Sequence, residues 1–143
     1  MDKTTNTIER FFEDVERETI AGEMTALAER FAEPFLAASH SGAKIAERST
    51  FTHDVPAKKQ MFEKLGSKGT KLVSLETSAI DTRYTLAKTR WQLTFEREGL
   101  MRQEVFADST YIVDTGAEPF QIILYLTSQD LLKVLVERGI IPA

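Results

Sequence analysis

The sequence lacks several features that would otherwise define a class of protein. It contains no cysteine, which excludes disulfides, thiolate metal sites and a cysteine nucleophile. No uncharged apolar run approaches the roughly 18 residues that a transmembrane helix needs, and the longest, residues 122–126, has the length of a buried strand. Phosphate-binding loops, dinucleotide fingerprints and the Gly-x-Ser-x-Gly elbow of hydrolases are also missing. These absences, with a polar amino terminus, predict a cytoplasmic protein without a membrane span.

Charge and size narrow the possibilities further. The net charge of -4 argues against nucleic acid as a partner, because nucleic-acid-binding surfaces are usually basic. A chain of 143 residues is long enough to bury one core, and we expect a single domain over residues 1–143. The two histidines, His40 and His53, lie thirteen residues apart without the spacing of a metal site. We therefore expect no metal and no cofactor.

Helical periodicity dominates the first part of the chain. A first apolar stripe follows Thr7, which is a plausible N-cap, and its phase slips at Ala21-Gly22, where we expect the helix to break. A second helical stripe, including Phe31, ends before Pro34. Residues 35–39 and 43–46 then predict a short hairpin, and Asp54 is the expected N-cap of a third helix that Gly66 ends.

Between residues 71 and 127 the period changes from helical to two. Strands are predicted over residues 72–79, 87–96, 105–113 and 120–126, with residues 67–69 as the loop before them. Gly-containing turns at 97–99 and 114–116 separate the strands, which favours an antiparallel meander. A closing helix with Ser128 as its cap is expected to follow.

Both faces of these strands carry apolar residues. One face is apolar and is centred on Trp91, Leu93, Phe95, Tyr111, Val113, Phe120 and Ile122, with Leu124 and Leu126 continuing the same alternation. The other face mixes apolar and polar residues, with Leu86, Phe106, Ile112, Ile123 and Tyr125 among them. A sheet that is wet on one side alternates more cleanly, so we predict that a second subunit covers this face and that the protein is a homodimer through its sheet.

The order of elements resembles the nuclear transport factor 2-like superfamily, and within it the SnoaL-like and ketosteroid-isomerase-like domains. The resemblance rests on Ala21-Gly22-Glu23 with Leu27 and Phe31, which look like the opening of the family's second helix, and on Phe120-Gln121-Ile122, which looks like its final strand. It implies an α+β, cystatin-like fold: a cone-shaped, curved antiparallel sheet with the N-terminal helices on its concave face. It also implies a dimer and a pocket between helices and sheet.

The resemblance also suggests where chemistry would occur. Aligning Gly42 with the glycine of the family's first hairpin places Ser39 or His40 at the position of the catalytic base. Asp108 is the carboxyl nearest to the position of the proton-donating acid. The family's donor tyrosine has no match, because Phe11 and Phe12 occupy that region. These departures argue against ketosteroid isomerase activity.

Two functions from different classes therefore remain open. In the first, a small, largely apolar ligand binds in the cone against Phe11, Phe12, Phe31, Trp91, Tyr111 and Arg90, and His40, His53 or Asp108 provides cofactor-free acid–base catalysis. In the second, these aromatic side chains complete an ordinary core, and the domain serves dimerisation or partner binding.

Overall fold

Ten elements make up the fold in a computed structural model that describes residues 3–127 and 131–142. The helices are α1 (Lys3–Ala21), α2 (Met24–Glu29), α3 (Ser49–Lys64) and α4 (Leu131–Glu137). The strands are β1 (Phe31–Ser39), β2 (Gly42–Ala46), β3 (Ser67–Ala79), β4 (Tyr84–Arg97), β5 (Leu100–Asp114) and β6 (Gln121–Thr127).

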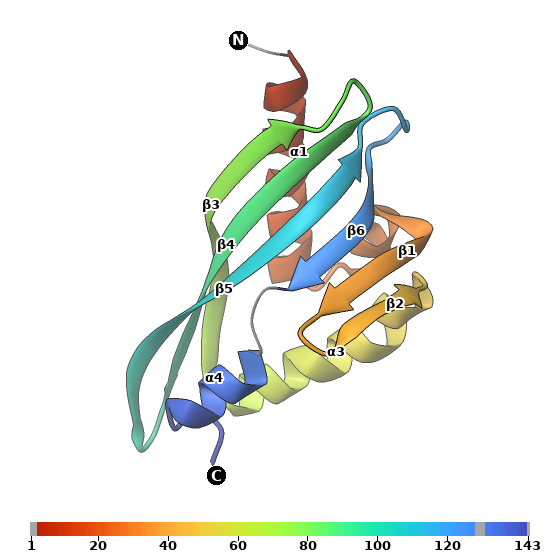
Figure 1. Cartoon of the computed structure of the whole chain (residues 1–143). Helices are drawn as coiled ribbons and strands as arrows, with labels where there is room; N and C mark the ends of the chain where they lie inside the picture. The colour runs from red at the N-terminus through yellow and green to blue at the C-terminus, as the bar shows by residue number, and fades with distance from the viewer. Residues whose placement is uncertain (1–2, 128–130, 143) are drawn as a thin grey trace.

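The strands form one six-stranded sheet in the order β2-β1-β6-β5-β4-β3 (Figure 1). The predicted meander is confirmed, because β3 to β6 pair antiparallel in chain order. The predicted hairpin of β1 and β2 extends this sheet, since β1 pairs with β6 in the parallel direction. The sheet is therefore mixed, with one parallel pairing among antiparallel ones.

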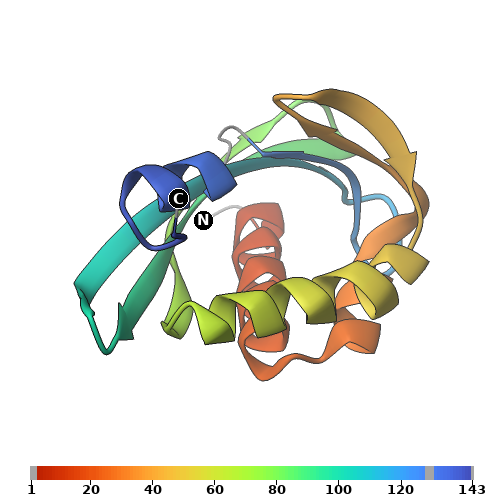
Figure 2. The same ribbon diagram turned by 90° about the horizontal axis from the view of Figure 1, so that it is seen from below.

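The sheet curves around two of the helices. Seen from below, it forms an arch, and α1 and α3 lie inside the arch while α4 lies at one end (Figure 2). The core sits between α1 and the concave face, and its largest fully buried side chains include Phe12 and Phe95. This arrangement confirms the predicted α+β fold with N-terminal helices on the concave side of a curved sheet.

A bulge in β6 reverses part of the predicted alternation. The pairing with β5 shifts between Ile122 and Leu124, so that Tyr125 pairs with Tyr111 and Leu124 pairs with Ile112. Because directly paired residues share a face, Tyr125 lies on the concave side and Leu124 on the convex side, opposite to the prediction. Leu126 follows Leu124 to the convex side, where it pairs with Thr110.

Thr7 lies inside α1, which begins at Lys3, so it is not the predicted N-cap. Other element boundaries also differ from the prediction. Phe31 begins β1 instead of ending a helix, because it pairs with Ile122 and packs its ring 4.7 Å from that of Phe35. Asp54 lies within α3, which begins at Ser49, so it is not the N-cap. Residues 67–69 belong to β3 rather than to a loop, and the predicted cap at position 128 lies outside the described residues.

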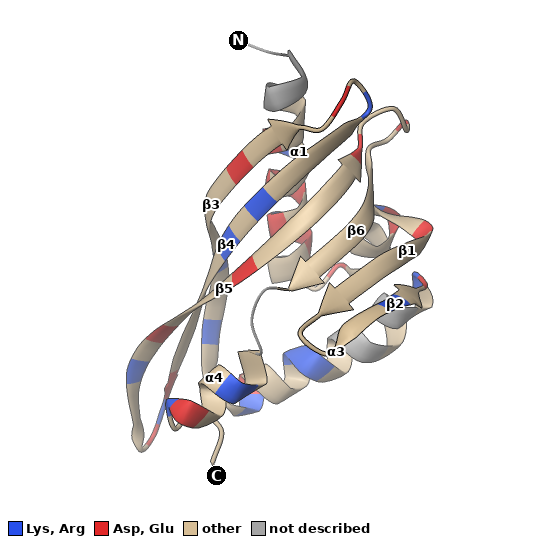
Figure 3. Ribbon diagram, viewed as in Figure 1, with Lys and Arg blue, Asp and Glu red and all other residues tan. Residues whose placement is uncertain are grey.

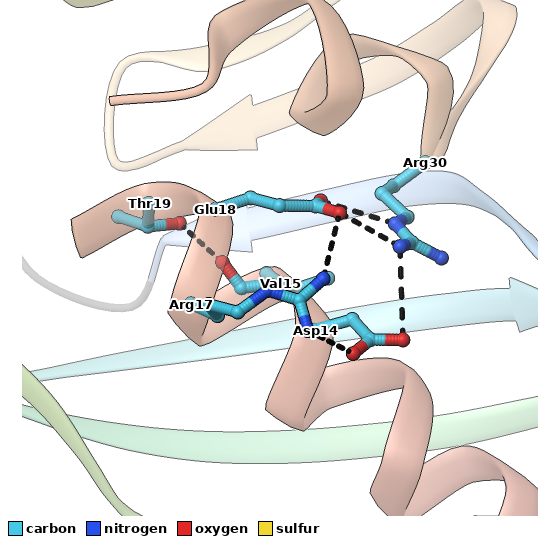
Figure 4. A network of polar contacts seen from close by, with 6 residues as sticks. All are labelled: Asp14, Val15, Arg17, Glu18, Thr19 and Arg30. Carbon is cyan, nitrogen blue, oxygen red and sulfur yellow. Dashed lines mark hydrogen bonds and ion pairs between the residues drawn. The ribbon is translucent and has the colours of Figure 1, made fainter. Parts of the chain in front are cut away.

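A buried carboxylate fixes α1 against the connection between α2 and β1 (Figure 4). Glu18 is only 2% exposed and accepts two hydrogen bonds from Arg30, from Nε at 3.1 Å and from Nη2 at 2.7 Å. Asp14 adds a weaker ion pair to the same guanidinium at 3.7 Å. A buried charge is tolerated when it is paired in this two-bond geometry, so the network holds the helix in one orientation.

A second carboxylate of α1 holds the edge of the sheet. Glu16 accepts a hydrogen bond at 2.6 Å from the backbone N–H of Leu72. Leu72 lies where β3 shifts its pairing with β4, so the carboxylate satisfies a donor beside a break in the ladder. Helix α1 is therefore hydrogen-bonded both to the segment before β1, through Glu18, and to the edge strand β3, through Glu16.

The convex face carries a row of apolar residues that crosses five strands. Successive register pairs join Ile45 to Leu36, Leu36 to Leu124, Leu124 to Ile112 and Ile112 to Leu86. Ile45 is 68% exposed, and the other four are half-buried. Figure 3 views the sheet from this side: the charged positions lie mainly on β3, β4 and β5, and β6 carries none.

Candidate ligand-binding site

A cavity of about 300 Å³ lies between the end of α1, α2, α3 and the start of β3. We call it the helix cavity, and its lining residues are Thr19, Ile20, Met24, Lys58, Lys59, Phe62, Glu63, Ser67, Gly69 and Thr70. The positive φ of +73° at Gly22 lets the chain turn sharply from α1 into α2 at its border. A Cβ atom there would come 2.8 Å from Lys59 Nζ, the mobile end of a side chain, so the positive φ is the stronger reason for glycine at this position.

The wall of the helix cavity is predominantly apolar. Its apolar lining residues include Ile20, Met24 and Phe62. Thr19 donates its hydroxyl hydrogen to the carbonyl of Val15 at 2.7 Å, so it needs no hydrogen-bond partner in the cavity (Figure 4). The charged residues among the described lining all come from α3 and are exposed to solvent: Lys58, Lys59 and Glu63. Such an apolar space with few polar groups at its border is typical of small-molecule sites.

A second, smaller cavity of about 170 Å³ lies where β1 ends and α4 begins. We call it the strand-end cavity, and its lining residues are Ser39, His40, Lys58, Ala107, Asp108, Ser109, Tyr125, Thr127, Leu131 and Leu132. Its lining is more polar than that of the helix cavity, since it includes hydroxyl groups from β5 and β6. Lys58 borders both cavities.

Several buried polar side chains lie on the concave face of the sheet near this cavity. Trp91 donates its indole N–H to the Thr89 hydroxyl at 3.0 Å, and Thr89 donates to the backbone carbonyl of Ser109 at 3.2 Å. Burial raises the pKa of Tyr111 well above its usual value, with a further contribution from Tyr125, and burial likewise raises the pKa of Tyr125. Both phenols therefore stay protonated at neutral pH and can donate a hydrogen bond.

Two of the residues predicted as catalytic border the same cavity. His40 and Asp108 both line the strand-end cavity, although they come from different strand ends. The Asp108 carboxylate is already engaged, since it accepts hydrogen bonds from Arg90 Nε at 2.9 Å and Nη2 at 3.2 Å. This hydrogen-bonded pairing lowers the pKa of Asp108, which keeps the carboxyl ionised at neutral pH.

The other predicted site residues lie elsewhere. Arg90 is exposed on the convex side, where its guanidinium carbon lies 5.6 Å from the ring centre of Phe106. His53 is exposed on α3 and borders neither cavity. The predicted pocket aromatics are all buried in the core and line neither cavity: Phe11, Phe12, Phe31, Trp91 and Tyr111.

Sequence reasoning missed the residues that line the cavities most directly. Lys58 was not singled out, although it lies one helical turn before Phe62 and its Nζ is 5.7 Å from that ring centre. The sequence of β4 did carry one signal of polar groups on the concave face. Thr85 and Thr89 lie at alternate positions with Trp91, so their hydroxyls lie on the apolar face of the strand. Tyr125 could not have been placed, because the bulge in β6 changes its side.

A metal site is not evident in the described part of the chain. Among residues 3–127 and 131–142, no three His, Cys, Asp or Glu side chains converge as ligands. Nor does any helix in those ranges have the length and apolar character to cross a bilayer.

Comparisons with known proteins identify the fold. No protein-family model and no curated protein matches the sequence. Solved structures do match. Aln2 from a Streptomyces species superposes with a TM-score of 0.72 at 9% identity over 94% of this chain and 96% of its own. A nuclear transport factor 2-like protein of unknown function from Shewanella oneidensis gives 0.64 at 16% identity over 88% and 99%.

A third similar structure has a name that refers to an activity. The putative scytalone dehydratase from Novosphingobium aromaticivorans gives a TM-score of 0.67 at 10% identity, over 87% of this chain and 82% of its own. Identities this low establish a common fold and nothing finer.

Proposed function

We propose that this chain, which has the nuclear transport factor 2-like fold, binds a small, largely apolar ligand in the helix cavity. The observation that carries the proposal is the apolar space of about 300 Å³ between the helices and the start of β3. This volume lies at the lower end of the range for ligand sites, which favours a compact ligand of one or two rings or a short aliphatic chain. The name of the similar putative scytalone dehydratase, a fold relative, is compatible with a small-molecule ligand.

A thermal-shift assay with uncharged probes of about 10 to 14 non-hydrogen atoms tests this proposal. Naphthamide at about ten times its dissociation constant should raise the midpoint of unfolding by about 3 °C or more. Thr70→Phe should remove the shift by filling the cavity, because Thr70 lines it and pairs with the buried Leu93. Ser74→Phe, on the same strand but outside the lining, serves as the control and should keep the shift. An equal shift in Thr70→Phe would contradict the proposed location, and no shift across the probe panel would favour the non-catalytic alternative.

The apolar row on the convex face supports a homodimer through the sheet. The row joins five neighbouring apolar residues, whereas apolar residues on a protein surface are usually scattered singly. No described element of the chain covers it. Ile112→Lys places a charge in the middle of the row and should yield a monomer in sedimentation at micromolar concentration. Ser74→Lys adds a charge on the same face outside the row and should leave the dimer intact. A wild-type protein that sediments as a monomer at this concentration would overturn the proposal.

Acid–base catalysis at the strand-end cavity is a second candidate function. It is favoured by the position of His40, which borders this cavity together with Tyr125 and the ionised Asp108. An imidazole suits proton abstraction next to a carbonyl, and a buried phenol can donate a hydrogen bond to the resulting enolate.

Exchange of the α-protons of β-tetralone in deuterated water measures such chemistry directly. The wild type should accelerate the exchange, His40→Asn should abolish the acceleration, and His53→Asn should retain it. Acceleration that depends on His53 instead would reverse the assignment. No acceleration by the wild type would leave binding without catalysis.

A further inference from the structure

Lys58 borders both cavities and forms no ion pair with any side chain that the structure describes. Arg30, Arg83 and Arg90 each form a close ion pair with an acidic side chain, at 2.7 to 2.9 Å. Among the side chains that the structure describes, none forms an ion pair with Lys58. Glu63 lines the same cavity without pairing with it. The ammonium is therefore available to a ligand.

The surroundings of Lys58 are apolar and crowded. Its Nζ lies 5.7 Å from the ring centre of Phe62, and the side chain borders both cavities. Water reaches the amine, yet the protein atoms around it take part of its hydration, and this desolvation lowers the pKa of Lys58. An anion placed beside the amine would compensate for the lost hydration, and the interaction would be stronger than at an open surface.

The charges that share the helix cavity with Lys58 favour an anion. Among the lining residues that the structure describes, Lys59 adds a second positive charge and Glu63 is the one negative residue, so these side chains are net positive. On the side of the strand-end cavity, Asp108 is the one carboxylate among the described lining residues, and Arg90 engages it. A ligand with an apolar body in the helix cavity would thus meet a cationic group at one end.

We propose that the ligand of this cavity is an amphiphilic monocarboxylate, with its apolar body against Ile20, Met24 and Phe62 and its carboxylate paired with Lys58. This inference rests on the proposed function and specifies its ligand class. Lys58 is the recognition residue that distinguishes the carboxylate from its uncharged analogues.

Naphthoate and naphthamide form a matched pair of probes, because they share a body and differ in charge. Calorimetric titration of the wild type should show naphthoate binding about ten-fold or more tightly than naphthamide. Lys58→Met should lose this preference while its naphthamide affinity stays within about two-fold of wild type. Lys58→Arg should keep most of the preference. Lys64→Met, on the same helix but outside both linings, is the control and should behave as wild type.

The outcomes separate the two proposals. If both probes bind the wild type equally, or if Lys58→Met keeps the preference for naphthoate, the assignment of Lys58 is wrong and the cavity proposal stands. If neither probe binds, both proposals fail. If Thr70→Phe still binds naphthoate in a Lys58-dependent manner, the body lies outside the helix cavity and the inference is overturned.

The pH dependence provides a second readout of the same residue. Naphthoate stays ionised from weakly acidic to alkaline pH, so its preference over naphthamide should follow the protonation of Lys58. The preference should be full below the pKa of Lys58 and should fall as the pH rises through it, at a pH below the usual lysine value of 10.5. The other titratable groups facing the two cavities are Lys59, Glu63, His40, Asp108 and Tyr125. A preference that instead changes near neutral pH and disappears in His40→Asn would assign the anion to His40.

Discussion

The two faces of the sheet use apolar residues in opposite ways. On the concave face, Trp91, Phe95 and Val113 are buried against helices of the same chain. On the convex face, a row of equally apolar residues stays half-exposed, and Ile45 at its end is 68% exposed. The concave face is completed within the chain except for its two cavities, whereas the convex face is not. The difference separates the two expected interactions, with a small ligand on one side and a second subunit on the other.

The two faces of the sheet also differ in the surroundings of their ion pairs. No buried side-chain nitrogen or oxygen within the described residues lacks a hydrogen-bond partner. The ion pair of Glu18 with Arg30 lies beneath the sheet, and that of Asp108 with Arg90 lies on its convex side, with the same two-bond geometry. Surroundings, rather than geometry, therefore set how much each pair contributes to stability.

The largest expected difference concerns two phenylalanines on opposite faces. Phe12→Ala, at a position with no exposure, should lower the free energy of unfolding by about 3–5 kcal/mol. Phe106→Ala, where the ring is 41% exposed on the convex side, should lower it by about 1 kcal/mol or less. Urea unfolding of both variants measures the difference. Equal losses would mean that the convex face is as tightly packed as the core.

The two ion pairs give the next largest difference. Glu18→Gln weakens the pairing of a partly buried guanidinium and should cost about 2–3 kcal/mol of unfolding free energy. Asp108→Asn should cost about 1 kcal/mol or less, since both partners are substantially exposed.

The pH dependence of the second pair has a definite sign. Because Arg90 lowers the pKa of Asp108 in the folded state, its contribution is present above the unfolded pKa of about 4. The contribution should disappear as the pH falls through the lowered folded value. Urea unfolding of wild type and Asp108→Asn across this acidic range should converge, and a gap that widens on acidification would contradict the assignment.

The smallest effect is expected at the end of the apolar row. Ile45→Thr should change the unfolding free energy of the monomer by about 0.5 kcal/mol or less, because the side chain is already exposed. If the row is a dimer interface, the loss should grow with protein concentration, since dimerisation contributes to the stability of the folded state. A concentration-independent loss would place Ile45 outside the interface.

Much of this fold was predictable because its signals are local. The change from a helical period to a period of two identified the four-stranded meander, and the pattern of elements identified the superfamily fold. The errors arose where long-range pairing overrode local preference. Phe31 fits the preceding helical stripe, yet its pairing with Ile122 makes it the first residue of β1. The bulge in β6 left no sequence signal and exchanged the faces of Leu124 and Tyr125.

The candidate site was predicted less well than the fold. His40 and Asp108 were singled out from the resemblance, and they do border one cavity. The aromatic residues assigned to the pocket pack into the core, because a concave face lined by large side chains fills most of its own space. Lys58 could not be identified from sequence, since an exposed helical lysine looks the same whether or not it lies between two cavities.

A titration followed by methyl NMR tests the central claim, ligand binding beneath the sheet, most directly. Ile20 and Met24 line the helix cavity, and Ile45 lies on the opposite face. Addition of naphthamide should shift the methyl signals of Ile20 and Met24 saturably and leave that of Ile45 unchanged. Saturable shifts at Ile45 with none at Ile20 and Met24 would place the ligand on the convex face and contradict the account.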